Sequence, residues 1–324
     1  MSRAQQASHP ALASELNRLA TETGNSASTG LDTRSALEIA QIIHREDARV
    51  APAVEKALPQ IATAIDWIAD ALRSGGRLIY VGAGTSGRIG ALDASECPPT
   101  FNTDPKQVQF VMAGGPKALG SAVEANEDSP ALGQRELAKK RPGKKDVVVG
   151  VAASGRTPFT VAAVEYARKR GARTIAVVCN PGSPLERAAE LAIVCEVGPE
   201  VVAGSTRMKA GTAQKMVLNL LSTGAMTRLG YVYGNLMVNV HLKNKKLVER
   251  GVRILMQAAG VDDAIARKTL RQAGNSVPVA LVMCKTGLGK KEAEQRLKTA
   301  QGHVRKAIAG AGGSNTSGTM GKNG

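Results

Sequence analysis

Short apolar segments alternate with longer segments of helical periodicity between residues 77 and 229, and glycine-rich turns separate them. Apolar runs of this length are typical of buried strands. Consecutive strands linked by helices pair in parallel, with helices covering both faces of the sheet. We therefore predict an α/β fold with three layers and a parallel sheet of about five strands. The predicted strands are Arg77–Val81, Val108–Met112, Asp146–Val151, Thr174–Val178 and Ala192–Val197.

Helices are predicted between these strands and before the first one. Ser35 and Glu38 have the spacing of a capping box, and helical periodicity follows them. A second amphipathic helix is expected over Val54–Leu72. The helices between the strands are expected near Ser86–Ala94, Pro116–Glu127, Thr157–Lys169, Leu185–Ala189 and Arg207–Leu229.

After Lys246 the sequence changes to helical segments punctuated by Gly260, Gly274 and Gly287, which are placed as helix C-caps or turns. These segments are Leu247–Ala259, Asp262–Ala273, Val277–Cys284 and Lys290–Ile308. The final stretch of Gly, Ser, Asn and Thr has little to bury and is predicted to be disordered, and the polar first twenty residues to be mobile. The predicted organisation is a tail and helix over 1–50, the α/β domain over 51–246, a small helical domain over 247–309 and a tail over 310–324.

Several classes of protein are disfavoured by composition. The longest apolar run, residues 147–153, is seven residues long, far below the roughly 18 that a membrane span requires. The polar N-terminus does not resemble a signal peptide, so we expect a cytoplasmic protein with no membrane partner. The four cysteines and four histidines are isolated in sequence, which predicts reduced thiols, no metal site and no cofactor.

The net charge is 43 − 27 = +16, which raises nucleic acid as a partner. The basic residues form short clusters interrupted by acidic ones, and aromatic residues make up 2% of the chain. Few rings are therefore present on which bases could stack. We interpret the basic clusters as solvated surface and predict no nucleic-acid partner.

The glycine-rich loop at residues 82–87 follows a predicted strand, begins a helix and satisfies the GxGxxG pattern. A dinucleotide site would also need an acidic residue near the end of the second strand. That strand ends at residues 110–115 without a carboxylate, so a nicotinamide cofactor is disfavoured.

Hydroxyl side chains gather instead at two loops that follow strands. The first loop carries Thr85 and Ser86, and the second carries Ser154 and Thr157. Backbone N–H groups at a helix N-terminus, together with such hydroxyls, bind phosphate without a metal. Any one of these residues could instead be an ordinary N-cap. The pair of loops predicts a phosphate site.

A third segment, residues 204–212, is also expected to begin a helix. Ser205 lies there beside Arg207 and Lys209, which could hold an anionic substrate. The alternative is a capped helix with solvated basic residues.

Two glutamates are candidates for acid–base chemistry. Glu96 precedes Pro98 and Pro99, which are expected to end the preceding helix, and Glu127 is also expected at a helix end. A helix C-terminus disfavours a carboxylate and suits a general acid. By composition alone, either glutamate could be an ordinary surface residue.

Three segments carry a recognisable pattern. The segment LIYVGAGTSGRIGALDASECPPT at residues 78–100 closely resembles the signature of the N-acetylmuramic acid 6-phosphate etherase family. Residues 152–158 (AASGRTP) and 204–215 (GSTRMKAGTAQK) resemble the same family, and the similarity extends over residues 20–308. Asn102 departs from the pattern, because a glycine is expected there.

The resemblance implies a sugar isomerase (SIS) domain, a small C-terminal helical domain and a homodimer. It also implies a carbon–oxygen lyase that cleaves the D-lactyl ether of N-acetylmuramic acid 6-phosphate in peptidoglycan recycling and amino-sugar catabolism. By this resemblance, Glu96 is expected to protonate the departing lactate oxygen. Glu127 is expected to take the C2 proton and later to help water to add. The expected phosphate ligands are Thr85, Ser86, Ser154, Thr157, Ser205 and Lys209.

One geometric conflict follows. If a helix runs unbroken from Ser86 to Ser95, Glu96 lies about 15 Å from the phosphate loop, at 1.5 Å per residue. Either that helix is short, or Glu96 serves the site of the partner subunit. Two other functions remain open: a sugar-phosphate isomerase on the same fold, and a sugar-phosphate sensor without catalytic activity.

Overall fold

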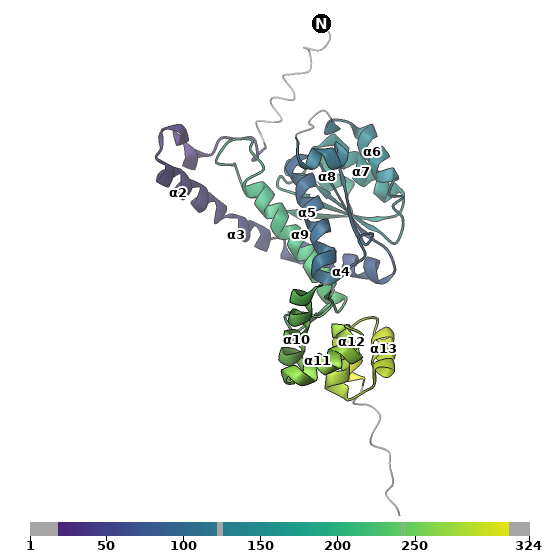
Figure 1. Ribbon diagram of the computed structural model, residues 1–324. Helices are drawn as coiled ribbons and strands as arrows, with labels where there is room; N and C mark the ends of the chain where they lie inside the picture. The colour runs from purple at the N-terminus through teal and green to yellow at the C-terminus, as the bar shows by residue number, and fades with distance from the viewer. Residues whose placement is uncertain (1–18, 122–125, 241, 243, 311–324) are drawn as a thin grey trace, which may run out of the picture. The chain divides into compact units, whose positions relative to one another are not determined.

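The computed structural model describes residues 19–121, 126–240, 242 and 244–310 (Figure 1). Within these ranges the chain divides into two compact units. Unit 1 holds the described residues through Glu96 together with Asp104–Gly224, and unit 2 holds Cys97–Thr103 and the described residues from Ala225 onward. Of the two predicted tails, residues 1–18 and 311–324 lie outside the described residues.

Unit 1 contains the predicted parallel sheet. Its strand order is β2-β1-β3-β4-β5, with all neighbours parallel. Gly82, at the end of β1, lies opposite Met112 of β2 on one side and Val151 of β3 on the other. The prediction of a five-stranded parallel sheet is confirmed. The strands are β1 Leu78–Gly82, β2 Val108–Met112, β3 Val147–Val151, β4 Arg173–Val178 and β5 Leu191–Val194.

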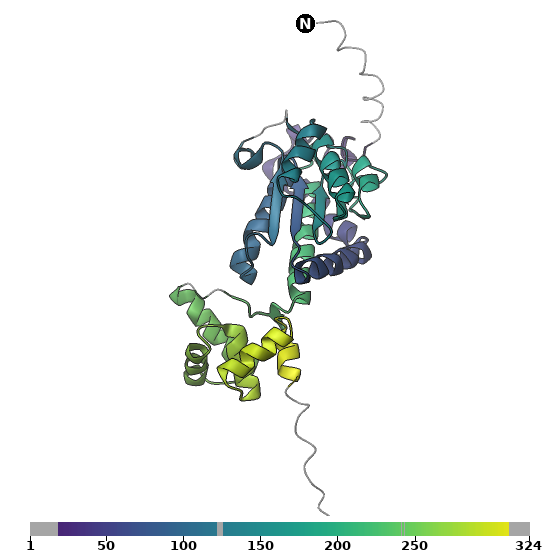
Figure 2. The ribbon, with the colours of Figure 1, turned by 90° about the vertical axis from the view of Figure 1, so that its right-hand side faces the viewer.

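Helices cover both faces of this sheet (Figure 2). Ile79 and Val81 of β1 belong to an apolar cluster that includes Phe159. Tyr80 points to the opposite face, as the two-residue period of a strand requires. There it packs beneath Gly90, and its hydroxyl donates to Asp93 at 2.8 Å. The helices that lie wholly or mostly in this unit are α2 Ala36–Asp47, α3 Val50–Glu55, α4 Leu58–Arg73, α5 Gly84–Phe101, α6 Pro130–Ala138, α7 Pro158–Lys169, α8 Pro184–Ala188 and α9 Lys209–Arg228.

The predicted capping box is confirmed. The Ser35 hydroxyl accepts from the Glu38 amide, and the Glu38 carboxylate accepts from the Ser35 amide at 2.9 Å. The predicted helix over Val54–Leu72 is instead divided between α3 and α4. Pro59 lies in the first turn of α4, where its missing N–H costs nothing and its fixed φ favours a new helix.

The prediction that Pro98 and Pro99 end their helix is wrong, because α5 continues through both prolines to Phe101. Each proline removes one amide donor but keeps its carbonyl. The Pro98 carbonyl accepts from the Asn102 amide at 2.9 Å. The helix ends at Phe101, and the next residue, Asn102, has a φ of +53°.

The predicted helix over Pro116–Glu127 does not form as expected. Gly115–Leu119 is a short 3-10 helix, and residues 122–125 lie outside the described part. Helix α6, which was not predicted, begins at Pro130. Ser129 caps it by accepting from the Leu132 amide at 3.2 Å, so a Ser-Pro start signal was present in the sequence.

Unit 2 is a small helical bundle preceded by a two-stranded hairpin, β6 Val232–Tyr233 and β7 Leu236–Met237. Gly260 and Gly287 are left-handed C-caps, as predicted. The predicted helix over Lys290–Ile308 is broken in two, because Gln301 and Gly302 both have positive φ. The helices are α10 Lys245–Ala259, α11 Asp263–Gln272, α12 Val277–Thr286, α13 Lys290–Thr299 and α14 Val304–Ala309. Residue 246, the expected domain boundary, lies inside this unit.

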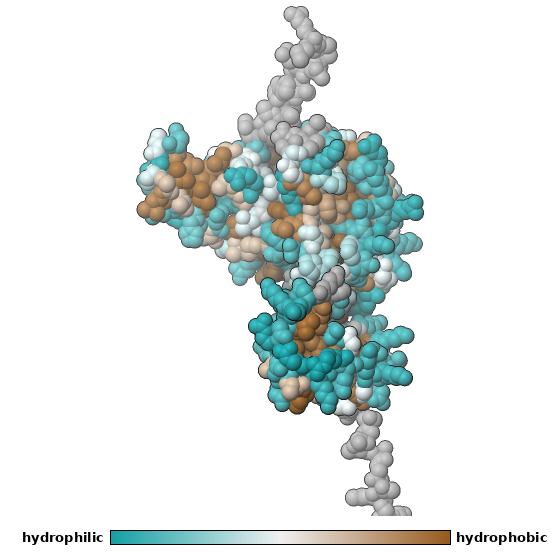
Figure 3. Space-filling view, in the orientation of Figure 1, coloured by the Kyte–Doolittle hydropathy of each residue, from teal (hydrophilic) through white to brown (hydrophobic). Residues whose placement is uncertain are grey.

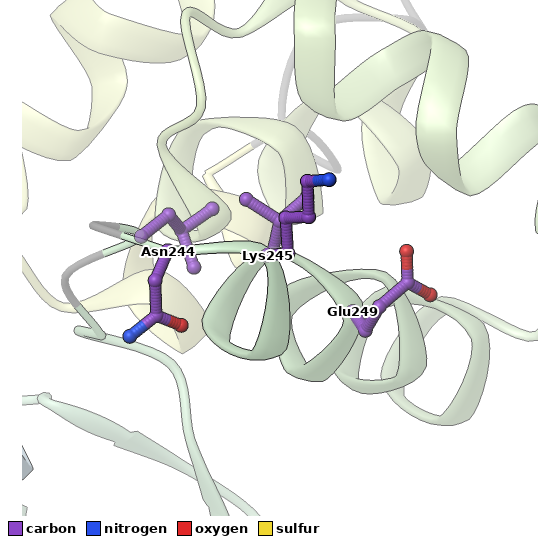
Figure 4. A pocket seen from close by; sticks show the side chains of 5 residues that line it. Asn244, Lys245 and Glu249 are labelled. Atoms are coloured by element: carbon purple, nitrogen blue, oxygen red, sulfur yellow. The ribbon is translucent and has the colours of Figure 1, made fainter.

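A concavity of about 450 Å³ lies at the start of α10 (Figure 4). Its lining includes Leu242, Asn244 and Lys245, and none of the predicted site residues lines it. No helix in the described ranges has the length and apolar character needed to cross a bilayer. Among the same residues, no group of three or more His, Cys, Asp or Glu side chains is arranged to hold a metal ion.

The contact between α6 and α7 permits a stability prediction. A Cβ atom on Gly133 would lie 2.0 Å from the carbonyl oxygen of Phe159, which is fixed in the backbone of α7. We expect Gly133→Ala to lower the free energy of unfolding by about 1–3 kcal/mol, the usual cost of overpacking. Gly143→Ala is the control, because nothing lies within 4 Å of its Cβ position. Equal urea midpoints for the two variants would contradict the prediction.

Candidate active site

The candidate site is built at the carboxyl ends of β1 and β3. The chain order of the strands reverses between these two neighbours, since β2 lies on one side of β1 and β3 on the other. In parallel α/β sheets, ligands bind at such a switch point, outside the carboxyl ends of the strands. The two predicted phosphate loops leave the sheet here, after Gly82 and after Val151, which are paired in register.

The first loop turns tightly from β1 into α5. A Cβ atom on Gly82 would lie 2.9 Å from the amide nitrogen of Gly87, so only glycine allows the helix to start this close to the strand. Gly84, the first residue of α5, has a φ of +52°. Thr85 and Ser86 follow in the first helical turn, where free backbone amides and the helix dipole favour an anion.

Ser86 is buried, and its hydroxyl donates to Oε1 of Gln214 at 2.9 Å. Thr85 packs against the same helix, α9, with its Cγ2 atom 3.4 Å from the Cβ position of Gly211. The first loop and α9 are therefore locked together. Gln214 was not predicted as a site residue, although it lies in the motif at residues 204–215.

The second loop is also tightly held. Gly155 has a φ of +67°, and a Cβ atom there would collide with Ser183 at 2.2 Å. The Ser154 hydroxyl accepts from the Arg156 amide at 3.2 Å. Thr157 occupies the N-cap position of α7 but makes no side-chain capping bond. Thr157 is therefore the N-cap residue, as the alternative expected, but its hydroxyl makes no capping hydrogen bond.

Glu127 is brought to the first loop by the fold. Its Oε1 atom lies 3.2 Å from the Cβ position of Gly84, and its backbone carbonyl accepts from the Phe159 amide at the start of α7 at 3.0 Å. The residue before Glu127, Asn126, has 3-10 helical conformation, which agrees with the expectation that Glu127 lies at a helix end. Glu127 precedes α6 and faces the N-terminus of α5, where the helix dipole stabilises negative charge.

Glu96 is not brought to the same place. Helix α5 is continuous from Gly84 to Phe101, so Glu96 lies about 15 Å along the axis from Ser86, at 1.5 Å per residue. Its side chain is exposed. The long distance between Glu96 and the first loop, which the sequence predicted for an unbroken helix, is therefore present within one chain.

The third predicted segment, residues 204–212, includes Lys209, whose contacts lie in the interior of the fold. The buried Glu200 carboxylate accepts from the amides of Lys209 and Ala210, at 3.0 and 2.9 Å, and so caps α9. The Lys209 side chain is fully buried, and its ammonium donates to Glu46. Ser205 lies half-buried in the turn before α9.

The Lys209–Glu46 pair predicts a pH-dependent contribution to stability. Burial raises the pKa of Glu46, but hydrogen bonds from Lys209 and Asn25 outweigh this and lower it overall. A lowered pKa stabilises the fold above the pKa of the unfolded chain, and this stabilisation is lost as pH falls through the folded pKa.

We expect Lys209→Met to cost about 3–5 kcal/mol of unfolding free energy near pH 7, because it leaves Glu46 charged and buried. The cost should shrink in acid, where Glu46 is protonated. Urea titrations at pH 7 and pH 4 measure both effects. The double variant Lys209→Met with Glu46→Leu should recover most of the loss, and equal losses in the single and double variants would refute the pairing argument.

Comparisons with known proteins agree with this architecture. Residues 60–168 match the family of the glucokinase regulatory protein N-terminal SIS domain, and residues 130–224 match the SIS domain. The predicted SIS-type fold is therefore confirmed.

Curated relatives match nearly the whole chain. The N-acetylmuramic acid 6-phosphate etherase of Aeromonas hydrophila is 51% identical over 290 residues, which cover 90% of this chain and 97% of that protein. The enzyme of the same name from Klebsiella aerogenes is 50% identical, with 91% and 98% covered. That from Symbiobacterium thermophilum is 57% identical, with 85% and 91% covered. Identity at this level, over nearly the full length of this chain and of each relative, shows that the chain belongs to the N-acetylmuramic acid 6-phosphate etherase family.

Proposed function

We propose that this chain removes the D-lactyl group from C3 of N-acetylmuramic acid 6-phosphate, releasing N-acetylglucosamine 6-phosphate and D-lactate. The observation that carries the proposal is the position of Glu127, whose carboxylate lies against Gly84 beside Thr85 and Ser86. A carboxylate next to an anion-binding loop places a base within reach of a bound sugar phosphate. Membership of the etherase family selects the substrate.

Glu96, Glu127 and one water account for every proton that moves in the proposed reaction. In the ring-opened sugar the C2 hydrogen is acidic because it lies next to the aldehyde. Glu127 takes this proton, the C–H electron pair becomes a C2–C3 double bond, and the C3–O bond breaks while Glu96 protonates the lactate oxygen. Water then adds at C3 and returns a proton to Glu96, and Glu127 returns its proton to C2. One water is consumed overall, and no cofactor takes part in any step.

The phosphate is assigned to the two loops. Thr85 and Ser86 would bind it at the N-terminus of α5, and Ser154 and Thr157 would bind it from the neighbouring loop. Lys209 is better placed as a structural residue, since its ammonium is already paired with Glu46 inside the fold. Ser205 remains a predicted ligand.

We further propose that the enzyme is a homodimer in which Glu96 of one chain completes the site of the other. The length of α5 supports this, because Glu96 and Glu127 cannot meet at one substrate within a chain. An apolar surface also lies on α2, where Leu37 is 69% exposed and hydrophobic atoms gather at the surface (Figure 3). Large exposed apolar surfaces mark protein interfaces.

A cytoplasmic location is also proposed. The four cysteines are all free thiols, which suits a reducing compartment. The proposal needs two partners, the sugar-phosphate substrate and a second copy of this chain.

The proposed reaction is tested by mixing the purified protein with N-acetylmuramic acid 6-phosphate and assaying D-lactate enzymatically. We expect lactate and N-acetylglucosamine 6-phosphate in equal amounts. Formation of a ketose that retains its lactyl group would identify an isomerase. Binding of the substrate with no product would identify a sensor.

A further inference from the structure

A second concavity lies in unit 1 at the amino ends of β3 and β4, away from the candidate active site. Its volume is about 350 Å³, which is large enough for a small molecule. Val147 and Arg173, the first residues of the two strands, both line it. At about 3.3 Å per residue, roughly 13 Å of β3 separates Val147 from Val151, after which the second phosphate loop begins. A ligand held here is therefore bound apart from the proposed reaction.

Trp67 lines this concavity and is the only tryptophan in the chain. The Arg173 guanidinium lies over the indole ring, with its central carbon 4.2 Å from the ring centroid. A guanidinium stacked in this way keeps N–H groups at the edge of the stack, where they can donate to an oxyanion. The stacking also restricts the Arg173 side chain before a ligand arrives.

The two carboxylates of the concavity are neutralised by arginines of their own. Asp146 is buried and accepts from the Arg77 amide at 2.9 Å and from the Arg77 guanidinium at 2.7 and 3.0 Å. Asp70 accepts from the Arg73 guanidinium at 2.5 Å. Neither carboxylate therefore offsets the other cations of the concavity.

Three cations in the concavity are not matched by an acidic side chain. In the part of the chain that the structure describes, no ion pair joins Lys144, Lys145 or Arg173 to a carboxylate. Cations that share one hollow attract an anion, and a doubly charged anion more strongly than a singly charged one. Lysine binds phosphate as a point charge, and arginine can donate two parallel N–H groups to it.

The backbone that carries the two lysines is held firmly. The Asp146 amide donates to the Gly143 carbonyl at 2.9 Å, and the Gly143 amide donates to the Asp146 carboxylate at 3.0 Å. A Cβ atom on Gly76 would lie 1.8 Å from the Lys145 carbonyl oxygen, so this turn packs directly against the segment after α4. Only the flexible ends of the lysines have to be ordered by a ligand, which lowers the entropic cost of binding.

We propose that Trp67, Lys144, Lys145 and Arg173 form a second binding site, the Trp67 site, for the dianionic phosphate group of a small organic molecule. Arg173 donates a pair of hydrogen bonds to the phosphate, and the two ammonium groups neutralise it. The concavity is larger than a free phosphate ion, and the indole offers apolar surface to the carbon skeleton that bears the phosphate. This ligand is additional to the substrate of the proposed reaction.

Trp67 reports on its own site, because its fluorescence responds to a charge bound beside the ring. The purified chain is titrated with glucose 6-phosphate at constant ionic strength, and with inorganic phosphate, glucose and acetate in separate runs. We expect a saturable change in emission with glucose 6-phosphate and none with glucose. Acetate, which carries one charge, should bind at least tenfold more weakly. No saturable response to glucose 6-phosphate would overturn the proposal, and equal affinity for inorganic phosphate would overturn the assignment to an organic phosphate.

Lysine variants keep the fluorescent reporter intact and locate the ligand. Lys144→Gln and Lys145→Gln are each expected to weaken binding of glucose 6-phosphate about tenfold, the lower end for a hydrogen bond to a charged group, because both lysines are exposed. Lys106→Gln, which removes an exposed lysine outside the lining, is the matched control and should bind as wild type does. Equal weakening by all three variants would reduce the effect to overall charge and overturn the proposal.

A loop variant separates this site from the candidate active site. Ser154→Ala should leave the fluorescence titration unchanged, while Lys144→Gln and Lys145→Gln should leave lactate release unchanged. A response that is lost in Ser154→Ala and kept in the lysine variants would place the ligand at the active site and overturn the proposal. If wild type releases no lactate, the proposed reaction fails, and the titration still decides whether the Trp67 site exists.

Discussion

Replacing Glu127 by glutamine is expected to lower kcat for lactate release by about 10²–10⁴-fold, the usual contribution of a positioned general base. Glutamine has the shape of the carboxylate and keeps the contact with Gly84, but it cannot take the C2 proton. The KM and the affinity for N-acetylglucosamine 6-phosphate should change little, because the phosphate loops are intact. Steady-state lactate assays and calorimetry measure the two effects separately.

The matched control is Asp128→Asn, which removes the adjacent carboxylate from an exposed position. It should retain nearly full activity. If Glu127→Gln raised KM and left kcat unchanged, Glu127 would be a substrate ligand, and the base would have to be sought elsewhere.

The second large effect concerns Glu96 and the subunit arrangement. Glu96→Ala and Glu127→Gln homodimers are each expected to be nearly inactive. In a mixed dimer of the two chains, one site combines the intact loops and Glu127 of the first chain with the intact Glu96 of the second. Random pairing makes half of the dimers mixed, and each has one of two sites, so about a quarter of wild-type activity should return, given a two-fold symmetric dimer.

Co-expression of the two chains with different affinity tags, followed by tandem purification, isolates the mixed dimer, which should show about half of wild-type activity by the same argument. A tandem-purified dimer of two wild-type chains is the positive control. If mixed dimers stayed as inactive as the single variants, both carboxylates would belong to one chain, and α5 would have to rearrange on binding. A monomer in solution would exclude the shared site outright.

Local signals in the sequence were enough to predict most strands of the sheet and the first turn of several helices. The strand over Val108–Met112 and the capping box of Ser35 and Glu38 were predicted residue for residue, because apolar runs and capping hydrogen bonds depend on near neighbours. The double proline led to a wrong prediction of where α5 ends. A proline after the first turn removes a single amide donor, and the packing of the remaining helix can offset that loss.

In the candidate site, too, the sequence predicted some features and not others. The glycine-rich loop and its hydroxyls were evident in the sequence, because a tight turn from strand to helix requires glycine at fixed positions. Glu127 was found through a family resemblance, and its position beside the N-terminus of α5 was not predicted. Its approach to Gly84 links residues 43 positions apart, and no local pattern encodes such a contact.

The sequence by itself determined the class of fold, the five parallel strands, the two glycine-containing loops after β1 and β3, and the family. These follow from hydrophobic periodicity, glycine positions and motifs, all of which are local. The tertiary structure alone decided that the Lys209 side chain is buried and paired with Glu46, that Ser86 is hydrogen-bonded to Gln214, and that Glu96 lies about 15 Å along α5 from Ser86. Burial and distance across the fold set those outcomes, because each depends on which helices pack together and not on the residues adjacent in sequence.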